Sequence, residues 1–321
     1  MTRILAYRFS AFGDVAMTVP VFREFLEQNP NVEIVMVSRN NFESLFADIP
    51  NVIFHGIDLD DYKGFFGIRR LGKELLDRYA PDHIADLHDV IRSKILDKFY
   101  VRKGLKVFKI NKGKEEKENL TDVWNLDKIQ LKKTVERYAD VFRDMGFKVV
   151  LSHHLRPKSN QKSGIGFAPF AQHKGKMLPL EKSFELVKIL AEKHTIYFFG
   201  GGKKETETLE SWEKQIPNTQ SLAGKLDLLE ELDRISKLEV MISMDSANMH
   251  LASVVGTRCV SIWGATHPFA GFLGFGQSEN DVVQINDLTC RPCSVFGDKE
   301  CYRGDWACLE EINVQQIIEK I

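Results

Sequence analysis

Short strand-like runs alternate with longer amphipathic runs along this chain, and the alternation occurs twice. In the first half, runs rich in β-branched and aromatic residues cover residues 4–9, 32–38, 52–57, 83–88 and 106–110. Because the runs are separated by patterns of helical period, each pair of strands must be joined by a crossover. Such connections produce a parallel sheet covered by helices on both faces. The first half of the chain is therefore expected to be an α/β domain.

The second half repeats the pattern after a polar segment. Residues 156–163 contain a proline and no apolar side chain, which is typical of a domain linker. Two domains also fit a chain of 321 residues. We predict an N-terminal doubly wound Rossmann-like domain over residues 1–157, a second one over 163–308, and a last amphipathic helix over 309–321. Ligands of such sheets bind at the carboxyl ends of the strands.

The charge distribution limits the kinds of partner. Lys and Arg total 44 against 45 Asp and Glu, a balance that argues against a nucleic-acid-binding protein. The N-terminus lacks the apolar core of a signal peptide, and the longest apolar runs are strand-sized, so we expect a cytoplasmic protein. Residues 102–133 hold ten basic and five acidic side chains, a local charge of +5. This segment is either a solvated polar loop or a contact for an anionic, lipid-linked partner at a membrane surface.

A small turn after the first strand is the first candidate site. Ser10-Ala11-Phe12-Gly13-Asp14 would let a ligand approach the backbone, and Asp14 falls in the first turn of a helix predicted over residues 14–28. A carboxylate in this position could act as a general base, or it could only cap the helix. The spacing leaves both interpretations open.

Three further segments follow strands of the second half. The helix start at Asp245 and Ser246 offers free N–H groups to phosphate oxygens, although both residues could serve only as caps, and His250 could be a core histidine. Lys176 lies in a loop after a strand, where it could neutralise a diphosphate or simply be solvated. Glu205 begins the helix after a Gly-Gly-Gly turn, where it could bind a ribose hydroxyl or favour the helix dipole.

Four of the five cysteines fall near the C-terminus, as Cys290-x2-Cys293-x7-Cys301-x6-Cys308. The first pair has the spacing of zinc ligands, whereas the second is wider than in zinc ribbons. A structural zinc site, free thiols and disulfides all fit this spacing, and the reducing cytoplasm makes disulfides the least favoured of the three.

Two long motifs resemble the lipopolysaccharide heptosyltransferases of glycosyltransferase family 9. The first covers residues 4–15 and continues through Thr18-Val19-Pro20-Val21; the second covers 240–252 and continues through 260–268. Shorter matches are found at 86–88 with Arg92-Ser93, at 135–138 and at 176–179. The matches are collinear over nearly the whole chain.

The resemblance implies the GT-B fold, with two Rossmann-like domains facing a cleft and the terminal helix packing back towards the first domain. It implies an inverting transferase that requires no metal or other cofactor for catalysis and moves a heptose or related sugar from an ADP-sugar. The implied acceptor is an anionic, lipid-linked core oligosaccharide of lipopolysaccharide at the inner-membrane surface, where the enzyme would be peripheral. By position, Asp14 matches the general base, and Lys176 and Asp245 match residues that hold the nucleotide sugar. Together with the segments described above, we assign Lys176, Glu205, Asp245, Ser246, Ala247 and His250 to the donor side. We assign Ser10, Gly13, His88 and Arg92 to the acceptor side.

Some residues depart from the family pattern and keep other functions open. Met244 stands where Asn is usual, Ala247-Asn248 stand where Gly-Leu is usual, and His88 stands where Gln or Asn is commoner. The alternatives are a GT-B sugar-nucleotide epimerase and a non-catalytic homologue that binds a nucleotide or glycan.

Overall fold

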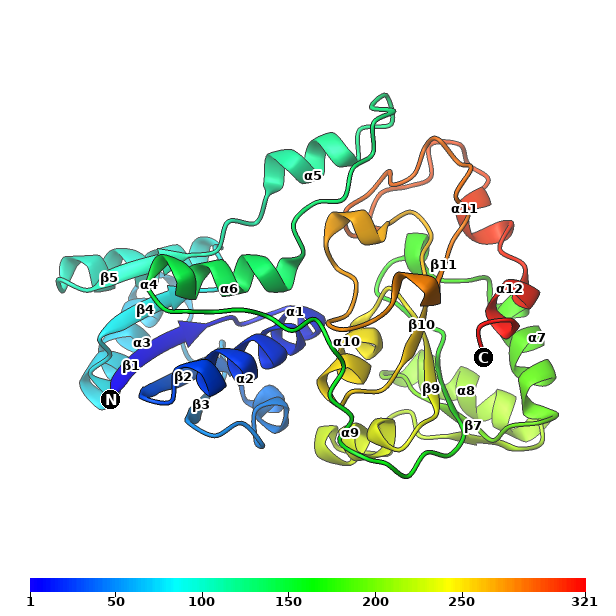
Figure 1. Ribbon diagram of the computed structural model, residues 1–321, viewed down its shortest axis with the longest axis horizontal. Helices are drawn as coiled ribbons and strands as arrows, with labels where there is room; N and C mark the ends of the chain where they lie inside the picture. Colours follow the sequence, from blue (N-terminus) through cyan, green and yellow to red (C-terminus); the bar gives the residue numbers. More distant parts are fainter. The chain divides into compact units, whose positions relative to one another are not determined.

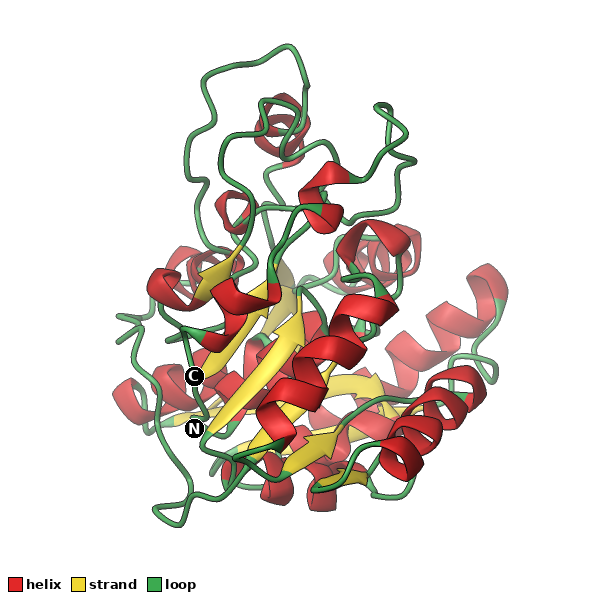
Figure 2. Cartoon of the chain, turned by 90° about the vertical axis from the view of Figure 1, so that its right-hand side faces the viewer, coloured by secondary structure: helices red, strands yellow, loops and turns green.

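A computed structural model describes all 321 residues and divides them into two compact units. The first unit comprises residues 1–112 and 134–152, and the second comprises 113–133 and 153–321. Each unit is built on a sheet whose strand pairs are all parallel, with helices packed around it (Figures 1 and 2). The α/β class predicted from the alternation of runs is confirmed. No helix combines the length and the apolar character needed to cross a membrane.

The sheet of the first unit has the strand order β3-β2-β1-β4-β5. Its strands are β1 (Thr2–Tyr7), β2 (Val32–Arg39), β3 (Val52–Ile57), β4 (His83–Asp86) and β5 (Lys106–Lys109). The chain adds β2 and β3 on one side of β1 and then β4 and β5 on the other. The order therefore reverses between β1 and β4, and the loops that follow these two strands meet at this switch point.

Helices cover both faces of the first sheet. They are α1 (Phe12–Ala16), α2 (Thr18–Gln28), α3 (Gly64–Tyr79), α4 (Ile91–Arg102) and α6 (Thr134–Asp144), with a 3₁₀ helix over Asn40–Leu45. α3 packs beside α4, and α2 packs beside α6 (Figure 1). The single helix predicted over 14–28 is divided at Met17. Pro20 explains the break, because it has no N–H to donate to the carbonyl of Ala16.

The sheet of the second unit has the order β11-β10-β9-β6-β7-β8. Its strands are β6 (Ile165–Ala168), β7 (Ile196–Phe198), β8 (Thr219–Ser221), β9 (Val240–Met244), β10 (Cys259–Ile262) and β11 (Val282–Val283). Every residue of β6 and β9 is buried, and all of them are apolar except Ser243. The order reverses between β6 and β9, so this unit also has one switch point.

The helices of the second unit include two short ones at the C-terminus in place of the single helix predicted over 309–321. They are α5 (Lys114–Leu120), α7 (Leu180–Ala191), α8 (Lys203–Gln215), α9 (Leu228–Ser236), α10 (Ala247–Val254), α11 (Ala307–Glu310) and α12 (Val314–Ile318), with 3₁₀ turns at Lys174–Lys176, Pro268–Ala270 and Glu279–Asp281. Leu309, Ile312 and Ile317 are buried in the core of the second unit, and α12 packs on α7. The expected packing of this segment towards the first domain stays a prediction.

Residues 113–133 also differ from the prediction, which made them part of a basic loop in the first domain. They belong to the second unit, where Leu120 and Leu131 are buried against Ala270 and the Leu131 N–H donates to the Phe269 carbonyl at 2.9 Å. The charge excess comes from residues 102–112, which hold five basic and no acidic side chains and include the edge strand β5, whereas residues 113–133 hold five of each sign. Lysines on an edge strand prevent pairing with other chains, which is a sufficient reason for part of this charge.

Candidate functional site

The loop after β1 places Asp14 beside a buried cation at the switch point of the first unit. Arg8 ends the strand segment, its side chain is 7% exposed, and its guanidinium lies 2.6 Å from Oδ2 of Asp14. The Ala11 N–H donates to the same oxygen at 3.3 Å, so Asp14 also caps α1. Burial opposes the charge of Arg8, but Tyr138 and Asp14 outweigh it and raise the pKa of Arg8. The ion pair therefore keeps the Asp14 carboxylate oriented, and its side chain remains 25% exposed.

The loop after β4 brings His88 to the same place. Its Nδ1 accepts the Phe9 N–H at 3.3 Å, and its Nε2 lies 3.5 Å from Oγ of Ser10. Burial lowers the pKa of His88 to about 3. The positive charges of Arg8, Lys112 and Arg39 also lower it, whereas the negative charge of Asp14 raises it. His88 is thus neutral near pH 7 and carries its proton on Nε2. It can donate a hydrogen bond from Nε2, but at this pH it does not act as a base.

The structure joins most of the predicted acceptor-side residues and leaves one apart. Ser10, Asp14 and His88 are linked through the contacts above, and half-buried Gly13 lies in α1 beside Asp14. Arg92 is exposed at the start of α4 and makes no hydrogen bond or ion pair with the rest of the protein.

A buried carboxylate, Asp86, shapes the loop that carries His88. Oδ1 of Asp86 accepts the N–H groups of His88 and Asp89, each at 2.8 Å, and Oδ2 accepts the hydroxyl of Ser93 at 2.8 Å. Behind it, Asp97 accepts a hydrogen bond from the Tyr7 hydroxyl. Burial and then the charge of Asp86 raise the pKa of Asp97 to about 7. Asp86 therefore fixes the backbone that positions His88.

The raised pKa of Asp97 predicts a stability that falls with pH. An unfolded chain loses this proton near pH 4, whereas the folded protein keeps it until about pH 7, so the folded state binds more protons in between. Stability from this group is complete below pH 4 and is lost, by up to about 1.4 kcal/mol per pH unit, as the pH rises to 7. Asp97→Asn keeps the acceptor for Tyr7 and should raise the unfolding temperature at pH 8 but not at pH 4. Parallel pH profiles for the two proteins would contradict this assignment.

In the second unit, an ion pair spans the switch point. Lys176 lies in the 3₁₀ turn after β6, Asp245 follows β9, and Nζ of the lysine is 2.9 Å from Oδ2 of the aspartate. The Asp245 side chain is 4% exposed and the Lys176 side chain 17%. β6 and β9 are neighbours in register, so their carboxyl ends meet, and the two predicted donor-side residues come together there.

The helix that follows Asp245 presents unused N–H groups. Ser246 is the N-cap of α10, yet its side chain makes no cap hydrogen bond and lies 3.1 Å from the hydroxyl of Ser243 instead. The first backbone N–H groups of α10 are thus left for oxygen atoms of a ligand. Ala247 begins this helix half-buried, and His250 is buried one turn further on. Met244, which replaces the usual Asn, accepts the Leu178 N–H through its sulfur at 3.4 Å.

Glu205 holds the glycine turn after β7. Its Oε2 accepts the Gly201 N–H at 2.8 Å, and a Cβ at Gly200 would lie 3.1 Å from the same oxygen. β7 is the neighbour of β6, so this turn lies at the same sheet edge as Lys176. Glu205 therefore shapes the loop, and its contact with a ribose stays a prediction.

A comparison with known families shows to which family the chain belongs. The model of "Glycosyltransferase family 9 (heptosyltransferase)" matches residues 68–302. The chain belongs to glycosyltransferase family 9. As a member of this family it is a glycosyltransferase. A relative from Campylobacter jejuni subsp. jejuni serotype O:6, lipooligosaccharide heptosyltransferase 2, is 24% identical over 318 residues, with 96% of this chain and 95% of the relative covered. Lipooligosaccharide heptosyltransferase 2 of Haemophilus influenzae is 26% identical over 80% of this chain and 81% of its own length.

Solved structures of similar proteins agree with the fold expected for family 9. The glycosyltransferase family 9 protein of Veillonella parvula superposes with a TM-score of 0.74 at 17% identity, covering 99% of this chain and 96% of that one. The ADP-heptose lipopolysaccharide heptosyltransferase II of E. coli gives 0.71 at 18% identity, covering 99% and 97%. The GT-B fold implied by the motifs is confirmed.

The four clustered cysteines of this family 9 chain line one small cavity of about 10 Å³. All are free thiols, and no group of three or more His, Cys, Asp or Glu side chains is arranged to hold a metal ion. Burial raises the pKa of Cys308 to about 12 and raises that of Cys293. Buried Arg291 lies among them and donates to the carbonyl of Gly264. The geometry does not support the predicted zinc site.

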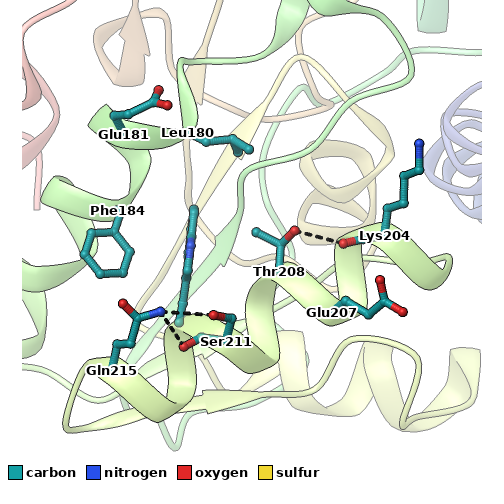
Figure 3. A pocket seen from close by; sticks show the side chains of 9 residues that line it. Leu180, Glu181, Phe184, Lys204, Glu207, Thr208, Ser211 and Gln215 are labelled. Atoms are coloured by element: carbon teal, nitrogen blue, oxygen red, sulfur yellow. Dashed lines mark hydrogen bonds between the residues drawn. The ribbon is translucent and has the colours of Figure 1, made fainter.

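A wide groove of about 760 Å³ lies between α7 and α8, and none of the predicted site residues lines it (Figure 3). Two of its polar side chains bond to their own helix: Thr208 donates to the Lys204 carbonyl at 2.9 Å, and Gln215 donates to the Ser211 carbonyl at 3.0 Å.

Sequence reasoning missed three cations on the acceptor side. Arg8, Arg39 and Lys112 all act electrostatically on His88. Arg8 directly follows β1 and Arg39 is the last residue of β2. A cation at the carboxyl end of a buried parallel strand is a signal that the sequence carries. Lys112 was counted only as part of the basic segment.

Proposed function

We propose that this enzyme transfers a heptose from ADP-heptose to an anionic core oligosaccharide of lipopolysaccharide, with inversion and without a metal ion. Support comes from the curated relatives, which are lipooligosaccharide and lipopolysaccharide core heptosyltransferases. Further support comes from solved E. coli structures of WaaC with ADP and with ADP-2-deoxy-2-fluoro heptose, the latter at 16% identity and a TM-score of 0.70.

The ion pair of Lys176 with Asp245, placed at the start of α10, carries the donor half of this proposal. When the sugar leaves, the C1–O bond breaks and its electron pair stays on the diphosphate of ADP. The Lys176 ammonium and the free N–H groups of α10 neutralise this growing charge. Such donors stabilise the transition state more than the bound substrate, because the charge is larger there. Asp245 holds the lysine in place.

The acceptor half rests on Asp14. Its carboxylate takes the proton of the acceptor hydroxyl while that oxygen attacks C1 from the face opposite the leaving ADP, which inverts the configuration. Neutral His88 donates its Nε2 proton to an acceptor oxygen. The cations Arg8, Arg39 and Lys112 around it fit an acceptor with negative charge. We place the enzyme at the cytoplasmic face of the inner membrane, as a peripheral protein.

Transfer to a soluble acceptor tests this function directly. The purified full chain, ADP-heptose and a deacylated core oligosaccharide should release one ADP per glycosylated product, with or without a chelator. UDP- and GDP-sugars serve as donor controls, and NMR of the product should report inversion at C1. Isomerised sugar nucleotide formed without acceptor would instead indicate an epimerase. Tight ADP binding without any transfer would indicate a non-catalytic homologue.

A further inference from the structure

Three large apolar side chains are exposed at the N-terminal ends of α3 and α4. Phe66 is 82% exposed, Ile91 81% and Phe65 47%. The buried stripe of α3 begins at Ile68, and the buried residues of α4 begin at Ser93. Packing of the first unit therefore explains neither Phe66 nor Ile91. We call these three residues the apolar edge.

The Phe65 and Phe66 rings lie 5.5 Å apart, and Ile91 lies at the same level on the neighbouring helix. α3 follows β3 and α4 follows β4, and a Cβ on Gly72 of α3 would lie 2.8 Å from Phe99 and 3.2 Å from Leu96 of α4. Phe65 on α3 and Ile91 on α4 each lie about two helical turns, or some 10 Å, nearer the N-terminus of their helix than this contact. The apolar edge is thus level on neighbouring helices and lies at the carboxyl edge of the sheet, where Asp14 and His88 also lie.

Basic side chains flank the apolar edge. The guanidinium of Arg69 lies 5.5 Å from the centre of the Phe65 ring, and Arg92 is next to Ile91 in the chain. Neither arginine has a carboxylate within ion-pair distance. The loop before α3 carries three carboxylates. Asp60 pairs with Lys63 at 3.2 Å, the Asp58 carboxylate accepts the Asp60 N–H at 2.9 Å, and no basic side chain forms an ion pair with Asp61. Exposed aromatic and aliphatic side chains with arginines beside them match the boundary between acyl chains and anionic headgroups.

We propose that the apolar edge docks the first unit on the surface of an anionic lipid bilayer. Phe65, Phe66 and Ile91 enter the headgroup boundary, and Arg69 and Arg92 bind lipid phosphates. This inference rests on the proposed function, because a lipid-linked acceptor is itself held in a bilayer. Docking would keep the sheet edge that carries Asp14 and His88 next to the membrane from which the acceptor sugar projects.

Vesicle flotation tests the docking. The full chain should float with vesicles of phosphatidylethanolamine and phosphatidylglycerol and much less with phosphatidylcholine alone. The double variant Phe66→Ser/Ile91→Ser should lower the partition coefficient about tenfold or more, because two large apolar side chains no longer leave water. Leu229→Ser is the matched control, since Leu229 is 57% exposed on α9 of the second unit. It should float like the wild type, and unfolding temperatures should confirm that every variant is folded.

Three results would overturn the docking proposal. One is a double variant that floats as well as the wild type. Another is loss of flotation in Trp124→Ser/Leu126→Ser instead, because that exposed pair belongs to the second unit. If the wild type forms a dimer that the double variant does not, the edge is a contact between copies and the proposal also fails.

Turnover on the deacylated acceptor should be unchanged in the double variant. A wild type that floats but shows no such turnover would refute the proposed function and leave the docking intact.

Discussion

Replacing Asp14 with asparagine is expected to lower kcat by about 10²–10⁴-fold while leaving the affinity for ADP within a factor of about two. The amide keeps the shape of the side chain and can still accept the Ala11 N–H that caps α1. It cannot take a proton from the acceptor hydroxyl. Initial rates of ADP release with a saturating deacylated acceptor measure kcat, and calorimetry measures ADP binding.

Asp227→Asn is the matched control for this change. Asp227 is also a carboxylate at the start of a helix, and it accepts the Glu230 N–H at 2.9 Å as the N-cap of α9. It lies outside both switch points, so its amide variant should turn over at the wild-type rate. If Asp14→Asn also kept wild-type turnover, Asp14 would be only a helix cap, which is the other interpretation that its spacing allowed.

The sequence was sufficient to predict which loops occupy the switch point of each sheet. The period of the apolar residues and the spacing of the strand runs predicted two parallel sheets. In such sheets, ligands bind at the carboxyl ends of the strands that flank a switch point. The turn after the first strand, with Asp14, and the one after β9, with Asp245, both occupy these points. Residues at a switch point are read well from sequence because one short loop determines their position.

Contacts between distant segments could not be read in the same way. Leu309, Ile312 and Ile317 have the spacing of an amphipathic helix, but a periodic pattern does not say which apolar surface it covers, and here that surface is the core built on α7. Residues 113–133 were equally ambiguous, because their polar composition hid the two leucines, Leu120 and Leu131, that anchor them. The cysteine spacing fitted three chemistries, and only the arrangement of the side chains bears on the choice.

Lys176 should matter to both the donor and the fold, and the two effects can be separated. Lys176→Met removes the cation that meets the leaving diphosphate, so kcat/KM should fall about 10²–10³-fold. It also leaves the Asp245 carboxylate buried without its partner, which should cost up to about 3 kcal/mol of unfolding free energy. Lys174→Met is the matched control, because the Lys174 ammonium lies over the Trp306 ring, 5.1 Å from its centre. That variant should change neither quantity by much.

The double variant Lys176→Met/Asp245→Asn distinguishes a structural role of the pair from a catalytic one. Without the buried carboxylate there is no uncompensated charge, so the unfolding free energy should return most of the way to the wild-type value. The leaving diphosphate would still lack its cation, so kcat/KM should stay low. If activity recovered together with stability, the ion pair would serve only the fold, and the charge on departing ADP would have to be met by α10 alone. Denaturant unfolding and ADP-release kinetics on the wild type, Lys176→Met, Asp245→Asn and the double variant complete the cycle.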